Sequence, residues 1–346
     1  MYRLEMPDVS VDQLRSRLGM MEARRAHYEG QSAAAGGMLK RHERWRHDYL
    51  SYPYLIGAPD DRLAERFRAV FINQTELGHD GTLGLLPVDV ENSFMLKFTH
   101  VMEDYAFRGG TPIDVVRVAR EPFLRYFENG DPIAVKMFAG YVAPLSPFLV
   151  KYGRRQFLEP MLREGRMRIC PAGFYNNQTL IEAVQDNEIS KTFFIPTFRE
   201  RLAGRHVLDF QGHRIPFGND DIVMPVVAPD YYLFSLCDHI YYRLPTDFDA
   251  DAALIIRDPI RLSQRMISAF LALRPDWDPL YGPVTYYDPY RDYTKVRIPQ
   301  MSKHFGYSYQ REVRIAFRAK QQLRTELQPE YLTIGSMADY AELVGA

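Results

Sequence analysis

A series of short apolar segments in the second half of the chain most constrains the fold. From about residue 165 these segments have the length of strands, are rich in Val, Ile, Tyr and Phe, and are bounded by Asp, Pro or Gly. They are RMRICPAGF, DIVMPVVA, YYLFSLC, DAALIIR, GPVTYYD, YSYQREVRIAF and YLTIGS. One good helix, PIRLSQRMISAFLAL, lies between them, with Pro259 at its start and Asp258 as its cap. Many strands with few intervening helices indicate an α+β sheet rather than a βαβ fold.

The first 150 residues have a different pattern. DRLAERFRAVFINQTEL, SFMLKFTHVMEDYAF and DPIAVKMFAGYVAPLSPFLVKYG repeat apolar residues with the period of a helix. The length of 346 residues is also more than one compact core usually holds. We therefore predict an α+β protein with a helical N-terminal region over residues 1–150, for recognition or regulation. A mixed, mainly antiparallel sheet domain with a candidate active cleft follows over residues 151–346.

Residues 11–28 form the clearest single helix of the N-terminal region. Their apolar residues follow a/d spacing, at Val11, Leu14, Leu18 and Met21. Asp8 or Ser10 can cap the helix at its start. Because two heptads are short for a coiled coil, we favour a helix packed on its own domain. A homodimer formed through residues 11–28 is the alternative.

Composition excludes several classes of protein. The net charge is −1, so the chain as a whole has no basic field for nucleic acid. The only two cysteines, Cys170 and Cys237, lack zinc spacing and fit a reducing compartment. The sequence has no apolar core typical of a signal peptide and no apolar run near the ~18 residues of a membrane helix. We expect a cytoplasmic protein without a membrane partner.

Familiar catalytic signatures are absent from the sequence. GxxxxGK[ST], GxGxxG after a strand, GxSxG and HExxH do not occur, which disfavours P-loop NTPases, common dehydrogenases, α/β-hydrolases and zincins. The basic run KRHERWRH, residues 40–47, carries an aromatic residue and could contact nucleic acid, but a solvated helix face is favoured. Asp249 and Asp251 in DFDAD could hold a divalent metal for a nuclease, although turn and capping roles are favoured for them.

The segment YSYQREVRIAF, from Tyr307 to Phe317, is an unusually charged strand candidate. An alternating strand places Gln310, Glu312 and Arg314 on one face and Arg311, Val313 and Ile315 on the other. The first face is continuously polar, and the second is apolar except for Arg311. This pattern predicts that one face packs on the core while the other lines a polar cleft or meets water. Glu312 could equally form a salt bridge with Arg314, Arg311 or Lys303.

Three strand segments carry a resemblance to a known family. MRIC contributes Arg168, FSLC contributes Ser235, and YQRE contributes Gln310 and Glu312, in that order along the chain. This order resembles the arginine–serine–glutamate class of ADP-ribosyltransferase folds. FYNN, FSLC and KHFGYSYQREVR also resemble a group of uncharacterised bacterial proteins with S-x-C and Y-x-x-E-x-R motifs. The resemblance covers about residues 150–320.

The resemblance implies NAD as a substrate and a role for each matching residue. Cleavage of the nicotinamide–ribose bond passes through a cation-like ribose, which a carboxylate beside it stabilises. Glu312 would be that catalytic carboxylate, and Gln310 would orient the acceptor. The residues that would bind NAD are Arg168, Ser235, Tyr175 and Tyr232. The sequence departs from the family pattern at Cys237, where a second serine or threonine is usual, and in placing Gln310 within the predicted strand.

The leading hypothesis is an enzyme that transfers ADP-ribose from NAD to a macromolecular acceptor, either protein or nucleic acid. Such an enzyme would be a bacterial toxin or phage-defence effector, with a cognate inhibitor as a further partner. The alternative is a non-catalytic interaction or regulatory protein of a defence system, whose sheet keeps the shape of a nucleotide-binding fold. A metal-dependent nuclease that uses Asp249 and Asp251 is the third hypothesis.

Overall fold

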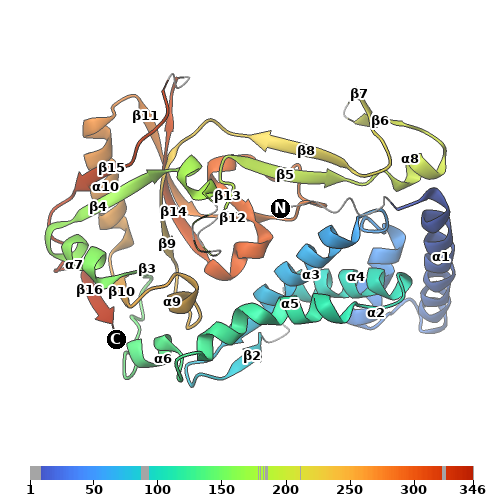
Figure 1. Ribbon diagram of the computed structural model, residues 1–346, viewed down its shortest axis with the longest axis horizontal. Helices are drawn as coiled ribbons and strands as arrows, with labels where there is room; N and C mark the ends of the chain where they lie inside the picture. Colours follow the sequence, from blue (N-terminus) through green and yellow to red (C-terminus); the bar gives the residue numbers. More distant parts are fainter. Residues whose placement is uncertain are drawn as a thin grey trace. The chain divides into compact units, whose positions relative to one another are not determined.

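The computed structural model describes residues 9–86, 93–177, 179, 181, 183, 186–210, 212–321 and 325–345. The chain forms two compact units, each assembled from three segments. The first unit consists of Met1–Gln74, Leu86–Pro122 and Thr192–Met224, and the second of Thr75–Leu85, Phe123–Lys191 and Pro225–Ala346. The units therefore do not correspond to a single cut near residue 150. Helices dominate the first unit and a sheet dominates the second (Figure 1).

The first unit is built mainly from helices. They are α1 (Val11–Ala34), α2 (Arg41–Ser51), α3 (Asp60–Gln74), α4 (Ser93–Phe107), most of α5 (Ile113–Leu124) and α8 (Phe198–Leu202). The helix predicted from residue 11 is confirmed and extends to Ala34. Ser10 caps it as expected, because its hydroxyl accepts a hydrogen bond from the backbone N–H of Gln13. Leu14 and Met21 of the predicted stripe are buried, whereas Val11 is exposed.

Two short two-stranded sheets lie outside the main sheet of the chain. β5 (Ser190–Ile195) pairs with β8 (Ile222–Val227), and β6 (Val207–Phe210) pairs with β7 (His213–Pro216). The first of these sheets contributes residues to both compact units, and the second belongs to the first unit. Within the described ranges, no helix combines the length and the apolar character needed to cross a membrane.

An eight-stranded sheet forms the centre of the second unit. Its strands are β3 (Leu149–Gly153), β4 (Arg166–Pro171), β9 (Tyr232–Cys237), β10 (Ala252–Ile256), β11 (Trp277–Pro283), β14 (Glu312–Ala319), β15 (Glu330–Thr333) and β16 (Ala341–Gly345). The order is β11-β14-β9-β3-β10-β16, while β4 pairs with both β9 and β15. Every pair formed by these described strands is antiparallel. The predicted α+β class with a mainly antiparallel sheet is confirmed.

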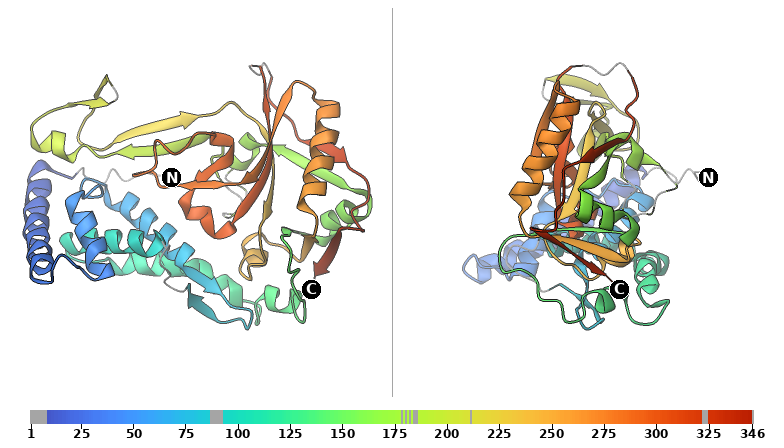
Figure 2. Two further views of the ribbon diagram at one scale, coloured as in Figure 1. Left: turned by 180° about the vertical axis from the view of Figure 1, so that it is seen from behind. Right: turned by 90° about the vertical axis from the view of Figure 1, so that its left-hand side faces the viewer.

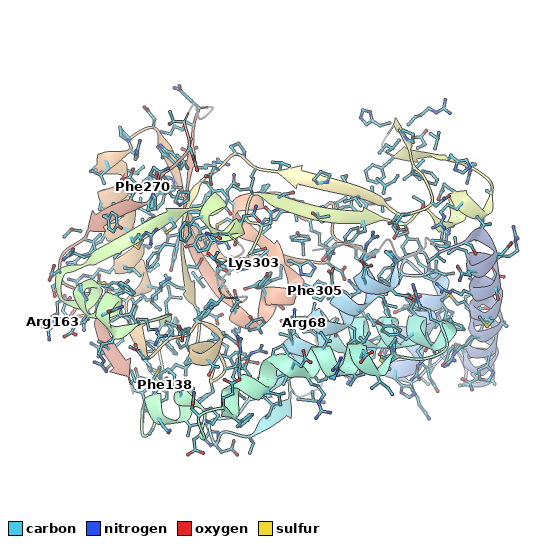
Figure 3. The ribbon with its side chains drawn as sticks, viewed as in Figure 1. Arg68, Phe138, Arg163, Phe270, Lys303 and Phe305 are labelled. Atoms are coloured by element: carbon cyan, nitrogen blue, oxygen red, sulfur yellow. The ribbon has the colours of Figure 1, made fainter. Side chains whose placement is uncertain are left out.

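Helix α10 (Pro259–Leu273) covers one face of this sheet (Figure 2). It begins at Pro259, and the Asp258 carboxylate accepts a hydrogen bond from the N–H of Arg261 at 3.0 Å, as the sequence predicts. Its apolar side carries Phe270, which Figure 3 labels, and contacts β14. The rings of Phe270 and Phe317 stack there with centroids 3.8 Å apart. Apolar residues of α7 (Arg155–Glu164) join the same core.

Short elements complete the second unit. They are β1 (Thr75–Leu77), β2 (Leu83–Leu85), α6 (Ile133–Met137), α9 (Leu244–Asp247), β12 (Thr285–Tyr287), β13 (Ser302–His304) and the 3₁₀ turns η1 (Arg125–Phe127), η2 (Ala172–Asn176), η3 (Pro299–Met301) and η4 (Phe305–Gln310). β12 and β13 form a parallel pair, whereas β1 and β2 are antiparallel. This parallel pair leads the chain into η4 and then into β14.

The helical pattern expected in DPIAVKMFAGYVAPLSPFLVKYG is wrong for its second half. Only α6 forms, and the segment ends in strand β3. Gly140 has a left-handed φ of 71° just after α6, and Pro144 and Pro147 further along cannot donate helical hydrogen bonds. The last residues instead pair with β10, where Val150 lies opposite Ile255. Long-range pairing therefore decides the structure of a segment whose local pattern is ambiguous.

The strand expected from Tyr307 is also wrong in its first half. Residues up to Gln310 form the 3₁₀ turn η4, and β14 starts at Glu312. Arg311 separates them with a left-handed φ of 45°, which an extended strand does not contain. The Arg311 side chain and carbonyl both contact Asp238, which holds this turn in place. From Glu312 onward the expected alternation is present, because Val313 and the next odd-numbered residues face the apolar core.

Candidate functional site

The site lies where the sheet forks beside β9. At one end β9 pairs with β3, where Cys237 lies opposite Val150. At the other end β9 pairs with β4 through Leu233 and Tyr232. Between these contacts the carbonyl oxygen of Ser235 accepts a hydrogen bond from the Lys151 amine at 2.8 Å. A lysine side chain thus occupies the position that a backbone N–H would have in an unbroken sheet.

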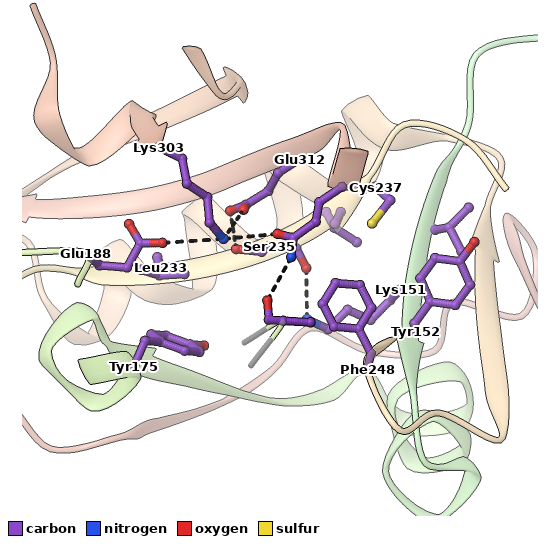
Figure 4. A pocket seen from close by; sticks show the side chains of 14 residues that line it. Lys151, Tyr152, Tyr175, Glu188, Leu233, Ser235, Cys237, Phe248, Lys303 and Glu312 are labelled. Atoms are coloured by element: carbon purple, nitrogen blue, oxygen red, sulfur yellow. Dashed lines mark hydrogen bonds and ion pairs between the residues drawn. The ribbon is translucent and has the colours of Figure 1, made fainter. Parts of the chain in front are cut away.

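A cavity of about 170 Å³ lies at this fork (Figure 4). Polar side chains from separate segments of the second unit line it, namely Lys151, Tyr175, Ser235, Lys303, Gln310 and Glu312. Apolar walls come from residues such as Leu233 and Phe248. A hollow with apolar walls and a few convergent polar groups is typical of a binding site.

Glu312 occupies the first position of β14 and is only 4% exposed. The Ser235 hydroxyl donates a hydrogen bond to its Oε1 atom at 2.5 Å, and Arg314 Nε donates to the same oxygen at 2.7 Å. Lys303 Nζ donates to Oε2 at 3.1 Å. Burial by itself would raise the pKa of Glu312, but the charges of Arg314 and Lys303 outweigh burial and lower it to about 2. The carboxylate is therefore ionised at neutral pH.

Arg314 connects Glu312 to a second buried glutamate. Its Nη1 and Nη2 atoms donate to the two carboxylate oxygens of Glu188 at 2.9 and 2.8 Å, in a bidentate pair. Nη1 also donates to the carbonyl oxygen of Gln300 at 2.8 Å. Burial disfavours the charged guanidinium, but the carboxylates of Glu188 and Glu312 outweigh it and raise the pKa of Arg314. Arg314 is therefore a fixed positive charge without solvent exposure.

Lys303 and Gln310 fix the other side of the carboxylate. Lys303 Nζ donates to Gln310 Oε1 at 3.0 Å in addition to its bond with Glu312. Gln310 Nε2 donates to the carbonyl oxygen of Ala183 at 2.7 Å, so both ends of its amide have partners. Burial opposes the charge of Lys303, but Glu312 and Glu188 outweigh burial and raise the pKa of this amine.

The structure brings four of the six predicted site residues to one cavity. Ser235, Gln310, Glu312 and Tyr175 line it together. The sequence pattern placed Gln310 within the strand. In the structure Gln310 instead ends the turn η4, just before the strand begins. The partners expected for Glu312 in a salt bridge are present in Arg314 and Lys303, whereas Arg311 pairs with Asp238.

The two other predicted residues lie elsewhere in the second unit. Arg168 is exposed on β4, with its guanidinium 5.0 Å from the ring centroid of Phe174. Tyr232 lies in the apolar core beneath α10, where its ring centroid is 5.4 Å from that of Phe270. Its hydroxyl donates to the carbonyl oxygen of Gln328 at 2.7 Å. Neither side chain lines the cavity.

Two residues of the site were not predicted from the sequence. Lys151 lies in the segment that was expected to be helical, so its position beside Ser235 could not be anticipated. Glu188 lies in a connection between η2 and β5, where no motif marks it. Only the charge of Arg314 could have pointed to Glu188. A buried guanidinium with Glu312 as its single partner has N–H donors left over, and these need a second acceptor.

The aspartates proposed for a metal have other partners. Asp249 forms an ion pair with Arg154, and Asp251 accepts a hydrogen bond from the backbone N–H of Arg155 at 2.6 Å. Asp251 thereby satisfies a donor at the start of α7. Over the described part of the chain, no group of three or more His, Cys, Asp or Glu side chains could hold a metal ion. A capping role therefore accounts for Asp251.

The basic run at residues 40–47 lies at the start of α2 in the first unit. The guanidinium of Arg41 lies 5.1 Å from the ring centroid of Trp45, and Arg46 forms an ion pair with the buried Glu103 at 3.3 Å. Part of this charge therefore serves interactions within the unit. A contact of this run with nucleic acid stays a prediction.

No protein-family model, curated protein or solved structure matches this chain. The resemblance to ADP-ribosyltransferases thus stays a prediction that rests on the residues themselves. In the structure an ionised carboxylate and a serine hydroxyl share one small, partly apolar cavity. Such an arrangement can hold a flat ring or a sugar and stabilise positive charge on it.

Proposed function

We propose that this chain cleaves the nicotinamide–ribose bond of NAD and transfers ADP-ribose to a macromolecular acceptor, with Glu312 as the catalytic carboxylate. The hydrogen bond of 2.5 Å from Ser235 to Glu312, in the wall of the cavity, carries the proposal. It joins the serine and the glutamate of the family resemblance in one place. These two residues lie far apart in sequence, so their order along the chain alone does not require this contact.

In this reaction the protein positions the substrate and stabilises the charge that develops on it. The bond from the ribose C1 carbon to nicotinamide breaks, and its electron pair leaves with neutral nicotinamide. The positive charge that develops on the ribose is stabilised by the Glu312 carboxylate, which is ionised because its pKa is lowered. A nucleophile of the acceptor then bonds to C1 and loses its proton. Ser235 and Arg314 keep the carboxylate in one orientation.

The size of the cavity determines how much of NAD it can hold. Sites for larger ligands have volumes of about 300–1,000 Å³. A cavity of about 170 Å³ therefore holds the nicotinamide ring with part of its ribose, but not the dinucleotide. Tyr175, which lines the cavity, would contact the nicotinamide ring. The phosphates would lie outside the cavity, and the family resemblance assigns their binding to Arg168, which is exposed.

The test is release of nicotinamide from NAD by the purified chain, supplied with protein, RNA and DNA as acceptors. We expect Glu312→Gln to lower the rate at least ~100-fold, the usual loss when one stabilising group is removed. Asp278→Asn is the matched control, because Asp278 is a partly exposed carboxylate on the neighbouring strand β11 and does not line the cavity. Circular dichroism and thermal unfolding show whether each variant is folded. Full activity of folded Glu312→Gln would contradict the proposal.

A non-catalytic regulatory protein is the second candidate, and one observation favours it. Glu312 is neutralised by Arg314 and Lys303, as a buried ion-pair network that only stabilises the fold would be. In that case wild type releases no nicotinamide with any acceptor, and Glu312→Gln changes only the free energy of unfolding. The same set of variants thus separates the two candidates.

A further inference from the structure

Lys151, which is partly buried, differs in its partners from the two buried lysines described in the second unit. Lys191 pairs with Glu188 at 3.2 Å, and Lys303 pairs with Glu312 at 3.1 Å. The Lys151 amine instead donates to the carbonyl oxygen of Ser235, and no described residue forms an ion pair with it. Only a neutral acceptor therefore holds this amine at the wall of the cavity.

Apolar side chains surround the Lys151 amine. It lies 4.5 Å from the ring centroid of Phe234, whose face attracts a cation, and the cavity wall nearby includes Leu233. Burial lowers the pKa of Lys151, and the neighbouring Glu312 opposes this effect only in part. Lys303, in the same cavity, has a raised pKa because it contacts carboxylates. The cavity thus holds one lysine whose pKa is raised by carboxylates and one whose pKa is lowered by burial.

We propose that Lys151 is a reactive amine that forms an imine with a small aldehyde or ketone bound in this cavity. The neutral Nζ atom attacks the carbonyl carbon, and its proton passes to the carbonyl oxygen to give a carbinolamine. Water then leaves as the C=N bond forms, so one carbonyl and one amine give one imine and one water. A neutral lysine in an apolar pocket is a suitable nucleophile for this reaction. The activity goes beyond NAD cleavage and does not depend on it.

The cavity also indicates which carbonyl compounds fit. Its volume of about 170 Å³ admits a molecule of a few carbon atoms rather than a large aldehyde. The carbonyl group would face Lys151, and the Ser235 oxygen, which lies near the same wall, can accept a hydrogen bond from a hydroxyl of the ligand. Short hydroxyaldehydes therefore match this wall of the cavity, where the amine and the Ser235 oxygen lie side by side. Glycolaldehyde is the simplest probe of this class.

The experiment traps the imine on the intact chain. The protein is incubated at pH 7 with glycolaldehyde and cyanoborohydride, which reduces the imine to a stable secondary amine, and labelled peptides are quantified by mass spectrometry. We expect Lys151 to be labelled faster than the exposed Lys136 and Lys320, because its lowered pKa leaves more of the amine neutral and the cavity holds the aldehyde beside it. We also expect the rate at Lys151 to saturate as glycolaldehyde increases.

Lys151→Arg provides the matched variant, because arginine can still donate to Ser235 but forms no such imine. Its labelling at Lys136 and Lys320 should equal that of wild type, which shows that the reagent is active, and circular dichroism shows whether the variant is folded. Unfolding wild type in denaturant should remove the preference for Lys151. Labelling of Lys151 at or below the rate of Lys136 in the folded chain, or a rate that rises linearly without saturation, would overturn the proposal. Neither result bears on nicotinamide release, so the two activities fail or succeed separately.

Discussion

The guanidinium of Arg314 explains how a strand in the core of the protein carries charge. It contacts Glu312 two positions away on its own strand and Glu188 from a distant connection. Both glutamates are ionised partners, so the buried cation is compensated on two sides. The polar face expected from the sequence pattern is therefore present, but it meets neither solvent nor an open cleft at Arg314. Only Glu312, at the end of the strand, reaches the cavity.

Arg314→Lys tests this account of the buried charge. Lysine has three donors and no planar fork, so it cannot keep the bidentate pair with Glu188 together with the bonds to Glu312 and Gln300. We expect the free energy of unfolding to fall by about 3–5 kcal/mol, as when a buried pair loses one partner. Chemical denaturation measures it. Arg318→Lys, at an exposed position of the same strand, should change it by less than ~0.5 kcal/mol. Equal effects of the two substitutions would contradict the account.

The side chain of Asp186 should make the free energy of unfolding depend on pH. Burial and the nearby charge of Glu188 raise the pKa of Asp186 to about 6, and its Oδ2 atom has no hydrogen-bond partner among the described residues. The folded state therefore binds more protons than the unfolded state between about pH 4 and 6. Ionisation of this side chain destabilises the fold as pH rises through that window. Below it, Asp186 is protonated in both states and has no effect.

Asp186→Asn should remove this contribution. We expect the free energy of unfolding of the variant to exceed that of wild type at pH 7, with the difference vanishing near pH 3.5. Denaturation curves at several pH values measure it, and Asp278→Asn is the control at a more exposed carboxylate. A difference between Asp186→Asn and wild type that stays constant from pH 3.5 to pH 7 would show that Asp186 does not titrate as described.

At the scale of elements, the sequence predicts a helix or strand correctly where caps, prolines and an amphipathic pattern mark it. α10 has a proline, a capping aspartate and an amphipathic pattern, and its limits and cap agree with the sequence. β3 and η4 lack such signals. β3 becomes a strand because it pairs with β10, and η4 replaces a strand because Arg311 adopts a left-handed conformation beside Asp238. These causes lie in contacts between distant segments, which a local pattern does not contain.

The turn between α7 and β4 depends on a glycine and offers a test at this scale. Gly165 has a left-handed φ of 69°, and a Cβ atom there would collide with the backbone of Gly335. Gly335 itself has a φ of 78°, but a Cβ atom on it would meet no neighbour within 4 Å. Both positions lie in the second unit. The two glycines thus separate backbone strain from steric conflict.

We expect Gly335→Ala to lower the free energy of unfolding by about 1–2 kcal/mol, the cost of a left-handed conformation. Gly165→Ala should lower it by clearly more, since the neighbouring backbone must also move. Thermal unfolding of the two variants beside wild type measures the difference. If Gly165→Ala cost no more than Gly335→Ala, the close approach of the two backbone segments would not exist.

At the scale of the whole molecule, the site is a product of chain topology. Its polar residues come from β3, from the connection around Glu188, from β9, and from the segment that leads from β13 into β14. The sequence identified Ser235, Gln310, Glu312 and Tyr175, because each lies in a recognisable motif. It could not identify Lys151 or Glu188, since these residues join the site only when the sheet forks and the connection folds over it.

The most direct test of the central claim is a crystal structure of Glu312→Gln grown with millimolar NAD. This conservative change keeps the shape of the cavity wall while slowing cleavage. The account predicts density for the nicotinamide ring inside the cavity near Tyr175, with the ribose beside residue 312 and the phosphates outside. NAD bound at another place, or an empty cavity at full NAD concentration, would contradict the assignment of this cavity as the NAD site.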